Sequence, residues 1–572
     1  MFFYGLLVVS CIALFTAWRK LYPKPYPGIP YNEASANRIA GDIPELLPVI
    51  QVANEFSNAV FTTTTRRLGT PIAQFLFPNL RRPLIALEDP REIEDIILRR
   101  NKEFDKASMA IDIFSSMFPR ASLSQRTTPQ LRAQKRLWAD VMGLDFLRKA
   151  AAPNIYKATI ELLELWRLKA STVYKNQAFR VSEDLKNAAL DAIWVALIGE
   201  EPGITRYEIE KLQLELDGKA GSNDPSRPPP PGVFLMEEVT YISDTVVRSS
   251  SKPSPKWAQK LETYTPRYRQ FRAKVTAEIS QYMKKAVDRF QRLDMGMLEA
   301  GALDTCMMDL VLRRQVLEAK KAGKPPTDPT RDMNMLDEMF VMLVGGFDST
   351  ASLLSWHVKF MEAYPAVQTE LREVLEAAFP GPGLPTVEDI LGADIPYLDA
   401  MVEESFRFAG VAKASLRQAV VDTEILGYKI PKGAEIIMNF HIDRAPIPVN
   451  ESKRSSGSRA AIARVGDGLQ SDAGRDLNRF EPKRWLVKDE VTGKVTFNAH
   501  ALPSLALGGG FRGCFGRRLA YMEFRIVVVL LTLDLVFLEL PDEFKSMAAT
   551  EKVFREPNMP FAKVKVLGKR TT

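Results

Sequence analysis

The stretch LALGGGFRGCFGRRLAYMEF, from Leu505 to Phe524, decides how the rest of the chain is interpreted. Five glycines surround one cysteine, Cys514, just before a segment with an amphipathic and then apolar helical pattern. Glycine adopts positive φ and lets backbone approach a flat ligand closely, and free N–H groups at a helix start favour an anion. The stretch predicts a thiolate at Cys514, with Arg512 placed to pair with a carboxylate of the same ligand. A lone cysteine is more often an inert core residue, but such a residue needs neither five flanking glycines nor an arginine.

The loop resembles the haem-binding loop of cytochromes P-450, whose pattern is Phe-Gly-x-Gly-x-Arg-x-Cys-x-Gly. The matching residues are Gly508, Gly510, Arg512, Cys514 and Gly516, followed downstream by Ala520 and Glu523. The resemblance implies haem b (iron protoporphyrin IX) as the cofactor and Cys514 as the axial ligand of its iron. Leu507 stands where the family usually has Phe, which implies altered shielding and redox tuning of the sulfur without loss of ligation.

Two further motifs imply a structural network on the thiolate side of the haem. Glu404 and Arg407 are three residues apart, so on a helix they share one face. They stand at the family's Glu-x-x-Arg position, and FEPKRW resembles its Phe-x-Pro-x-Arg-Phe/Trp element, which makes Arg484 the third member. Breaking one partner of a buried ionic network is strongly destabilising. Between the two motifs, the resemblance implies that Arg417 reaches a haem propionate.

The segment from Met339 to Phe360 predicts the helix on the oxygen side. Its adjacent glycines, Gly345 and Gly346, each cost about 1 kcal/mol relative to alanine in a helix. Close approach to a flat cofactor explains that cost, and a loosely packed core helix is the alternative. Asp348, Ser349 and Thr350 follow and resemble the family's Ala/Gly-Gly-x-Asp-Thr-Thr motif. The resemblance implies a hydroxyl that donates to iron-bound oxygen and an acid that relays protons, and leaves Ser349 and Thr350 as alternative donors.

Upstream, QLRAQKRLWADVM resembles the family's haem-propionate helix, with Leu131 where Trp or His is common. Either Lys135 or Arg136 takes the place of the usual arginine, and the sequence does not choose between them. The expected substrate pocket is apolar, which is the usual lining of a ligand pocket. Its expected lining residues are Phe114, Met117, Phe118, Val411 and Leu416.

The first residues predict a transmembrane anchor over 1–22. Phe2 to Trp18 carries no charge, close to the minimum of about 17 residues for a spanning helix. Arg19, Lys20 and Lys24 follow, which places the downstream domain in the cytosol by the positive-inside rule. A cleaved signal is disfavoured because no Lys or Arg precedes the apolar run. Residues 23–31 predict a stiff proline-rich neck, and the resemblance implies a single-pass protein of the endoplasmic reticulum membrane in contact with membrane lipid.

The remainder, 32–572, predicts one catalytic domain of mainly α structure with small β-sheets, an α+β cytochrome P-450 fold. Helical patterns include 333–363, 365–378 and 398–408, short strands lie between 411 and 440, and 81–100 predicts a strand, a turn and a helix. Residues 447–475 show little periodicity and predict a solvated surface insertion. The three cysteines offer no disulfide framework. The 77 basic and 70 acidic residues give a mixed surface unlike that of a nucleic-acid binder.

The resemblance implies a haem-thiolate monooxygenase that inserts one atom of O2 into a lipophilic small molecule, in the style of microsomal fungal enzymes of secondary metabolism. Electrons would come from NADPH–cytochrome P-450 reductase, since the sequence has no flavin or dinucleotide fingerprint. A haem-thiolate isomerase or dehydratase without external electrons is one alternative, and a non-catalytic haem-binding protein is another. Retention of Asp348, Ser349 and Thr350 speaks against both.

Overall fold

The computed structural model describes residues 21–79, 81–218, 229–250, 252, 254–294, 305–324 and 328–568. Nearly all of the predicted anchor lies outside these residues. The predicted neck, 23–31, contains no helix and is bound to strand β1 (Ile72–Phe75) by Gln74. The Gln74 side-chain oxygen accepts from the Tyr26 N–H at 2.8 Å, and its amide donates to the carbonyls of Tyr26 and Ile29. The neck is therefore fixed to the sheet.

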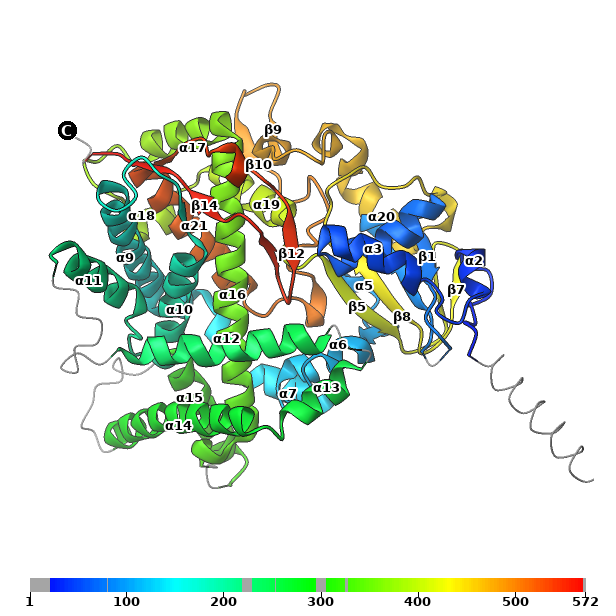
Figure 1. Ribbon diagram of the computed structural model, residues 1–572, viewed down its shortest axis with the longest axis horizontal. Helices are drawn as coiled ribbons and strands as arrows, with labels where there is room; N and C mark the ends of the chain where they lie inside the picture. The colour runs from blue at the N-terminus through cyan, green and yellow to red at the C-terminus, as the bar shows by residue number, and fades with distance from the viewer. Residues whose placement is uncertain are drawn as a thin grey trace, which may run out of the picture.

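Helices dominate the described chain, and the predicted fold class is confirmed (Figure 1). The helices are α2 Glu33–Ala36, α3 Ile43–Ala53, α4 Phe56–Phe61, α5 Pro90–Leu98, α6 Ser108–Asp112, α7 Pro129–Leu137, α8 Leu144–Phe146, α9 Ala152–Ser171, α10 Ser182–Ile198, α11 Ile204–Leu216, α12 Pro231–Ser250, α13 Pro255–Glu262, α14 Pro266–Asp294, α15 Met307–Lys321, α16 Met333–Ala363, α17 Pro365–Ala378, α18 Val387–Gly392, α19 Pro396–Ala409, α20 Ser456–Val465 and α21 Arg517–Asp534. The remaining strands are β2 Leu84–Leu87, β3 Phe104–Lys106, β4 Phe179–Arg180, β5 Ala414–Ala419, β6 Thr423–Ile425, β7 Tyr428–Ile430, β8 Glu435–Asn439, β9 Leu486–Lys488, β10 Val495–Phe497, β11 Leu535–Phe537, β12 Ala549–Glu551, β13 Arg555–Pro557, β14 Phe561–Ala562 and β15 Val564–Val566.

Helix α16 runs through the middle of the helical part of the molecule (Figure 1). Asp332 caps its start by accepting from the N–H groups of Asn334 and Met335. Most of its residues are buried, and it packs along α10 and α21. Among the described residues it is the one helix long and apolar enough to span a membrane. Its burial among other helices identifies it as the core helix of a globular domain.

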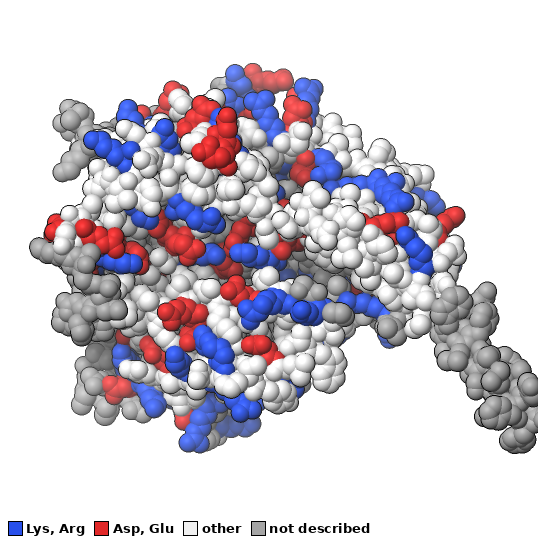
Figure 2. Space-filling model, viewed as in Figure 1, with Lys and Arg blue, Asp and Glu red and all other residues white. Residues whose placement is uncertain are grey.

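A five-stranded sheet forms the other part of the domain, in the order β1-β2-β8-β5-β3. Strands β2 and β8 are parallel, and the other neighbouring pairs are antiparallel. The β3–β5 register sets Lys106 opposite Arg417. Figure 1 shows α3 and α5 beside this sheet, away from the helices around α16. The viewed face of the molecule carries interspersed basic and acidic side chains (Figure 2).

The last strands close the helical part, and Arg555 of β13 holds several segments together. Its carbonyl oxygen accepts from the Ser352 hydroxyl at 2.6 Å and from the Trp356 indole at 2.9 Å, both on α16. Its guanidinium donates to Glu55 and to the Ala409 carbonyl. One residue near the end of the chain thereby joins the N-terminal region, α16 and the end of α19.

Residues 447–475 differ from the expected solvated loop. They contain α20 and short 3₁₀ turns, and Arg454, Ser458 and Leu469 are buried. Figure 1 shows α20 lying next to α5. The segment has weak apolar periodicity because buried polar contacts, more than an apolar face, hold it in place.

Candidate functional site

The Cys514 loop lies between the C-terminal end of α5 and the start of α21. Gly508 and Gly510 have φ of +61° and +62°, a region that favours glycine. A Cβ on Gly510 would also lie only 2.4 Å from the carbonyl oxygen of Ile97. The Cys514 N–H donates to the Leu507 carbonyl at 2.8 Å and closes the loop. Here glycine lets the loop backbone approach α5, a reason that the sequence did not indicate.

The sulfur of Cys514 is accessible although neighbouring segments enclose it. Burial raises the pKa of this thiol, whereas an N–H bond from Gly516 and the positive charges of Arg517 and Lys135 act to lower it. A Cβ on Gly516 would meet nothing within 4 Å. The sulfur therefore faces open space inside the protein, with a backbone donor and two cations arranged to stabilise a thiolate.

Basic side chains gather beside the loop, and burial together with the positive charges of three of them lowers the pKa of the fourth, Lys106. The four members are Lys106, Lys135, Arg417 and Arg512. Burial lowers the pKa of Arg417 to about 10, helped by Arg512. Within the described part of the chain, Arg417 donates to neutral oxygens, the Ser415 hydroxyl at 3.1 Å and the Leu416 carbonyl at 3.2 Å. The carboxylate of Asp105 lies 3.9 Å from Arg512. Buried charges need partners, so this cluster suits a ligand that carries carboxylates of its own.

The structure separates the two candidates on α7. The Lys135 ammonium donates to the Phe511 carbonyl at 2.7 Å and lies 4.6 Å from the centre of the Phe511 ring. Burial and Arg512 lower its pKa. Arg136 is exposed to solvent. Lys135 is brought to the site and Arg136 is not, because on a helix adjacent residues face different directions.

On α16, the two glycines have different surroundings. A Cβ on Gly346 would lie 2.6 Å from Ile193 Cγ1 of α10, so Gly346 permits close packing of two helices. A Cβ on Gly345 would meet nothing within 4 Å. The Ser349 hydroxyl donates to the Gly345 carbonyl, and Ser349 is half-exposed. Gly345 and Ser349 therefore border open space, whereas close approach to a cofactor does not explain Gly346.

Asp348 belongs to a row of alternating charges that ends at the protein surface. Its carboxylate lies 3.8 Å from the Lys186 ammonium of α10, which lies 3.4 Å from Glu556 of β13. Glu556 pairs with Lys552 at 2.9 Å. Asp348 is 8% exposed and Lys552 is exposed. Burial raises the pKa of Asp348 to about 6; Lys186 opposes this and Glu556 adds to it. Such a pKa suits proton exchange near neutral pH.

Thr350 faces a different neighbour. Its hydroxyl lies 3.3 Å from the Glu523 carboxylate of α21, and Thr350 is buried. Burial raises the pKa of Glu523 to about 8, so this acid is largely protonated at neutral pH. Thr350 thus joins two helices, and Ser349 is the hydroxyl that borders open space.

Glu404, Arg407 and Arg484 meet around one carboxylate. The Glu404 oxygens accept from Arg407 at 2.6 and 2.8 Å and from Arg484 at 3.0 Å. Trp485, not anticipated from the sequence, donates its indole N–H to Glu404 at 2.9 Å. Burial acts to raise the pKa of Glu404, but the two arginines lower it below its usual range. The arginines also donate to backbone carbonyls between 442 and 479.

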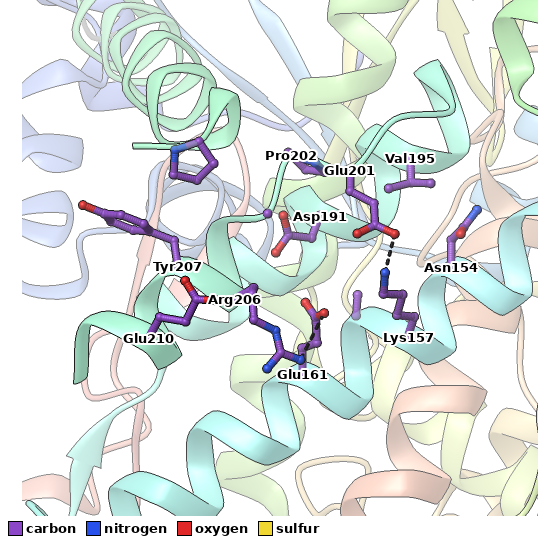
Figure 3. A pocket seen from close by; sticks show the side chains of 13 residues that line it. Asn154, Lys157, Glu161, Asp191, Val195, Glu201, Pro202, Arg206, Tyr207 and Glu210 are labelled. Atoms are coloured by element: carbon purple, nitrogen blue, oxygen red, sulfur yellow. Dashed lines mark hydrogen bonds and ion pairs between the residues drawn. The ribbon is translucent and has the colours of Figure 1, made fainter. Parts of the chain in front are cut away.

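Two of the five expected pocket residues are packed in the core, and three are half-buried. Met117 and Phe118 are almost fully buried, and the Phe118 ring stacks on Phe340 with centroids 5.0 Å apart. Phe114, Val411 and Leu416 are half-buried. A separate cleft of about 540 Å³ lies between α9, α10 and α11 (Figure 3). It is lined by charged side chains such as Lys157, Glu201 and Arg206, and no predicted site residue lies in it.

These observations fit the implied haem. An accessible, enclosed sulfur lies beside basic side chains that outnumber the acids near them, and Gly345 and Ser349 border open space. The sequence did not point to Lys106 or Lys186, because each reaches its site from another part of the fold. A haem supplies an iron for the sulfur and two propionates for the cations, so the donor set matches the group.

Comparisons of the sequence and of the fold with known proteins point to one family. A family model described as Cytochrome P450 matches residues 42–442, which include α16 and Glu404. The chain is 29% identical to the cytochrome P450 monooxygenase TRI13 of Fusarium sporotrichioides over 99% of each chain. It is 30% identical to the cytochrome P450 monooxygenase xilC of Penicillium rubens over 98% of this chain and 96% of the relative. A crystal structure described as a cytochrome P450, CYP102L1, superposes with a TM-score of 0.65 at 16% identity, covering 95% of this chain and 100% of that one.

Proposed function

Since the chain belongs to the cytochrome P450 family, a family of haem proteins, we propose that it is a haem-thiolate monooxygenase that inserts one atom of O2 into a lipophilic small molecule. Its relatives are fungal monooxygenases, and one of them, 33% identical over 42% of this chain, is named for the Hps1-dma1 cluster of Dothistroma septosporum. We infer a role in fungal secondary metabolism from the similarity to these relatives.

The observation that carries the proposal is the Cys514 sulfur, accessible inside the protein and flanked by basic residues. In the proposed complex Cys514 binds the iron, and Arg417, Lys135 and Arg512 bind the propionates. When bound in this way, the haem supplies oxygen activation, which a cysteine thiolate promotes by donating electron density to iron. The surrounding chain positions the substrate and excludes water.

Two residues of α16 handle protons in the proposed mechanism. The Ser349 hydroxyl borders the open space and holds a position fixed by the Gly345 carbonyl. Asp348, with a pKa of about 6, exchanges protons with its surroundings at neutral pH. Lys186 keeps part of the Asp348 population ionised, since its charge lowers the pKa of Asp348. In this proposal the pair delivers protons to the reacting centre.

Electrons come, in this proposal, from NADPH through cytochrome P-450 reductase. Arg132 lies 5.6 Å from the centre of the Phe511 ring, and Arg518 lies in the first turn of α21; both are exposed beside the Cys514 loop. Basic side chains on that face fit an acidic partner protein and speed its association. Arg136, exposed one helical turn after Arg132 on α7, would add to this basic surface. Residues 1–22 would hold the enzyme in the endoplasmic reticulum membrane, facing the cytosol and in contact with membrane lipid.

The test is the carbon monoxide difference spectrum of the dithionite-reduced full chain. The wild type and Cys306→Ala, which removes a buried thiol elsewhere, should both show a strongly red-shifted Soret band. Cys514→Ala should lose that band. A histidine-type band in the wild type, or a red-shifted band that persists in Cys514→Ala, would overturn the proposal. NADPH-dependent turnover with reductase then separates a monooxygenase from an isomerase or dehydratase, which needs no external electrons.

A further inference from the structure

Helix α5 carries charged side chains that solvent does not reach. Its N-cap Asp89 and its residues Arg91, Glu92 and Asp95 are each at most 2% exposed. Charged side chains are almost never fully buried unless they are paired. The segment that covers them is 451–468, named here the α20 segment.

The first contacts of the α20 segment are an ion pair and a hydrogen bond to acids of α5. Arg454 donates to Asp89 at 2.6 Å, and both side chains are buried. The Ser455 hydroxyl donates to Asp95 at 2.7 Å. A Cβ on Gly457 would lie 2.2 Å from an Asp95 oxygen, so glycine is required for α20 to lie this close. Both ends of the acidic face of α5 are therefore held.

The far end of the α20 segment reaches α5 again and then the chain that leads to the Cys514 loop. Asp467 lies 3.3 Å from the Arg91 guanidinium. A Cβ on Gly468 would overlap the carbonyl oxygen of Ala501, only 1.5 Å away. Ala501 lies shortly before Leu505, where the loop segment begins. The segment thus contacts both elements that flank the loop.

The opposite end of α5 contacts the loop directly. A Cβ on Gly509 would lie 2.5 Å from Leu98 Cδ2, and one on Gly510 would lie 2.4 Å from the Ile97 carbonyl oxygen. The Gly513 N–H donates to the Gly510 carbonyl at 3.1 Å, one residue before Cys514. Closely packed interiors transmit displacements. A shift of α5 along its axis therefore moves the backbone that carries the sulfur.

We infer that the α20 segment sets the position of the Cys514 sulfur through α5, and that Arg454 is a positioning residue for the thiolate ligand. The inference rests on the proposed function, because it takes Cys514 as the haem ligand. Arg454 lies on the far side of α5 and touches neither the loop nor the open space at the sulfur. Its effect is carried by Asp89, α5 and the loop glycines.

The experiment uses the full-length haem-loaded protein, held well below its unfolding temperature. Arg454→Met keeps the length of the side chain and leaves the buried Asp89 charge without its partner. We expect the red-shifted carbon monoxide band to convert to the unshifted form about tenfold faster, because an uncompensated buried charge displaces the helix end. The haem reduction potential should change as well. Arg464→Met, at an exposed arginine on α20 in the same segment, should match the wild type.

Two further variants keep the inference open to refutation if Arg454→Met folds poorly. Ser455→Ala removes one hydrogen bond to α5 and should give a smaller change in the same direction. Asp89→Asn combined with Arg454→Met removes both charges and should return the conversion rate toward the wild-type value. If these variants lower the unfolding temperature but leave the band, its conversion rate and the potential unchanged, the α20 segment only stabilises the fold. Absence of the band in the wild type would instead overturn the proposed function.

Discussion

The two sides of the candidate haem site are built in different ways. On the proposed ligand side, Glu404 meets fixed partners: it accepts five hydrogen bonds, from Arg407, Arg484, Trp485 and the Glu481 N–H. On the α16 side, Asp348 has a loose ion pair at 3.8 Å and a pKa of about 6. One side fixes geometry and the other holds charge that responds to pH. The Glu404 network therefore tolerates little change, whereas the charge of Asp348 depends on pH and on its neighbours.

Loss of charge in the fixed region should have the largest effect. Glu404→Gln removes the anion shared by two buried arginines, and we expect the free energy of unfolding to fall by about 3–5 kcal/mol. Denaturant unfolding of the haem-loaded protein measures this change. Glu490→Gln, at an exposed position, is the control. A cost for Glu404→Gln as small as that of the control would mean that the network is not needed for stability.

An intermediate effect should distinguish the two hydroxyls of α16. In Ser349→Ala, the fraction of consumed NADPH that yields product should fall by about tenfold or more, because the hydroxyl that delivers the proton is lost. Thr350→Ala should change that share little and instead lower stability, because the Thr350 hydroxyl lies at a packed interface with Glu523. The measurement compares product with hydrogen peroxide during turnover with reductase. The reverse result would assign the oxygen-side role to Thr350.

The smallest effect should come from the charges around Asp348, which are Lys186, Glu556, Lys552 and Asp244. Lys186→Met removes a cation and should raise the pKa of Asp348 above about 6, and Glu556→Gln removes an anion and should lower it. Asp348 would then ionise at higher pH in the first variant and at lower pH in the second. The rate at fixed pH should change less than about tenfold, the effect of one pKa unit.

The carboxyl infrared band of Asp348, identified by its loss in Asp348→Asn, reports this titration without substrate. Lys565→Gln, exposed on β15, should leave the midpoint where it is in the wild type. Equal midpoints in the Lys186 and Glu556 variants would show that burial alone sets the pKa of Asp348, and the contrast between the two sides would then be one of packing only.

Features that are local in the sequence were predictable, and features that depend on tertiary contacts were not. The thiolate loop, the Glu404–Arg407 pair and the bounds of α16 follow from short spacings. Lys106 joins the cation cluster through the β3–β5 register, and Ile193 explains Gly346 from another helix. Residues 447–475 were expected to be a solvated loop because they show little periodicity, and the contacts that hold them in place are polar. Neither the strand register nor a distant polar partner leaves a periodic pattern along the chain.

The hydrogen bonds between Arg555 and α16 also determine when the contacts of α16 can be completed during synthesis of the chain. Ser352 and Arg555 are 203 residues apart, so translation at roughly 5–20 residues per second leaves on the order of 10–40 s between them. During that interval α16 lacks the Arg555 carbonyl to which its Ser352 hydroxyl donates. Glu55 is made earlier than Ser352, so it lacks its Arg555 partner for longer. The Cys514 loop is made late in the same interval. Until its last strands are made, a nascent chain therefore lacks the bonds of Arg555 to Ser352, Trp356 and Glu55, so the contacts that join the N-terminal region to α16 form last.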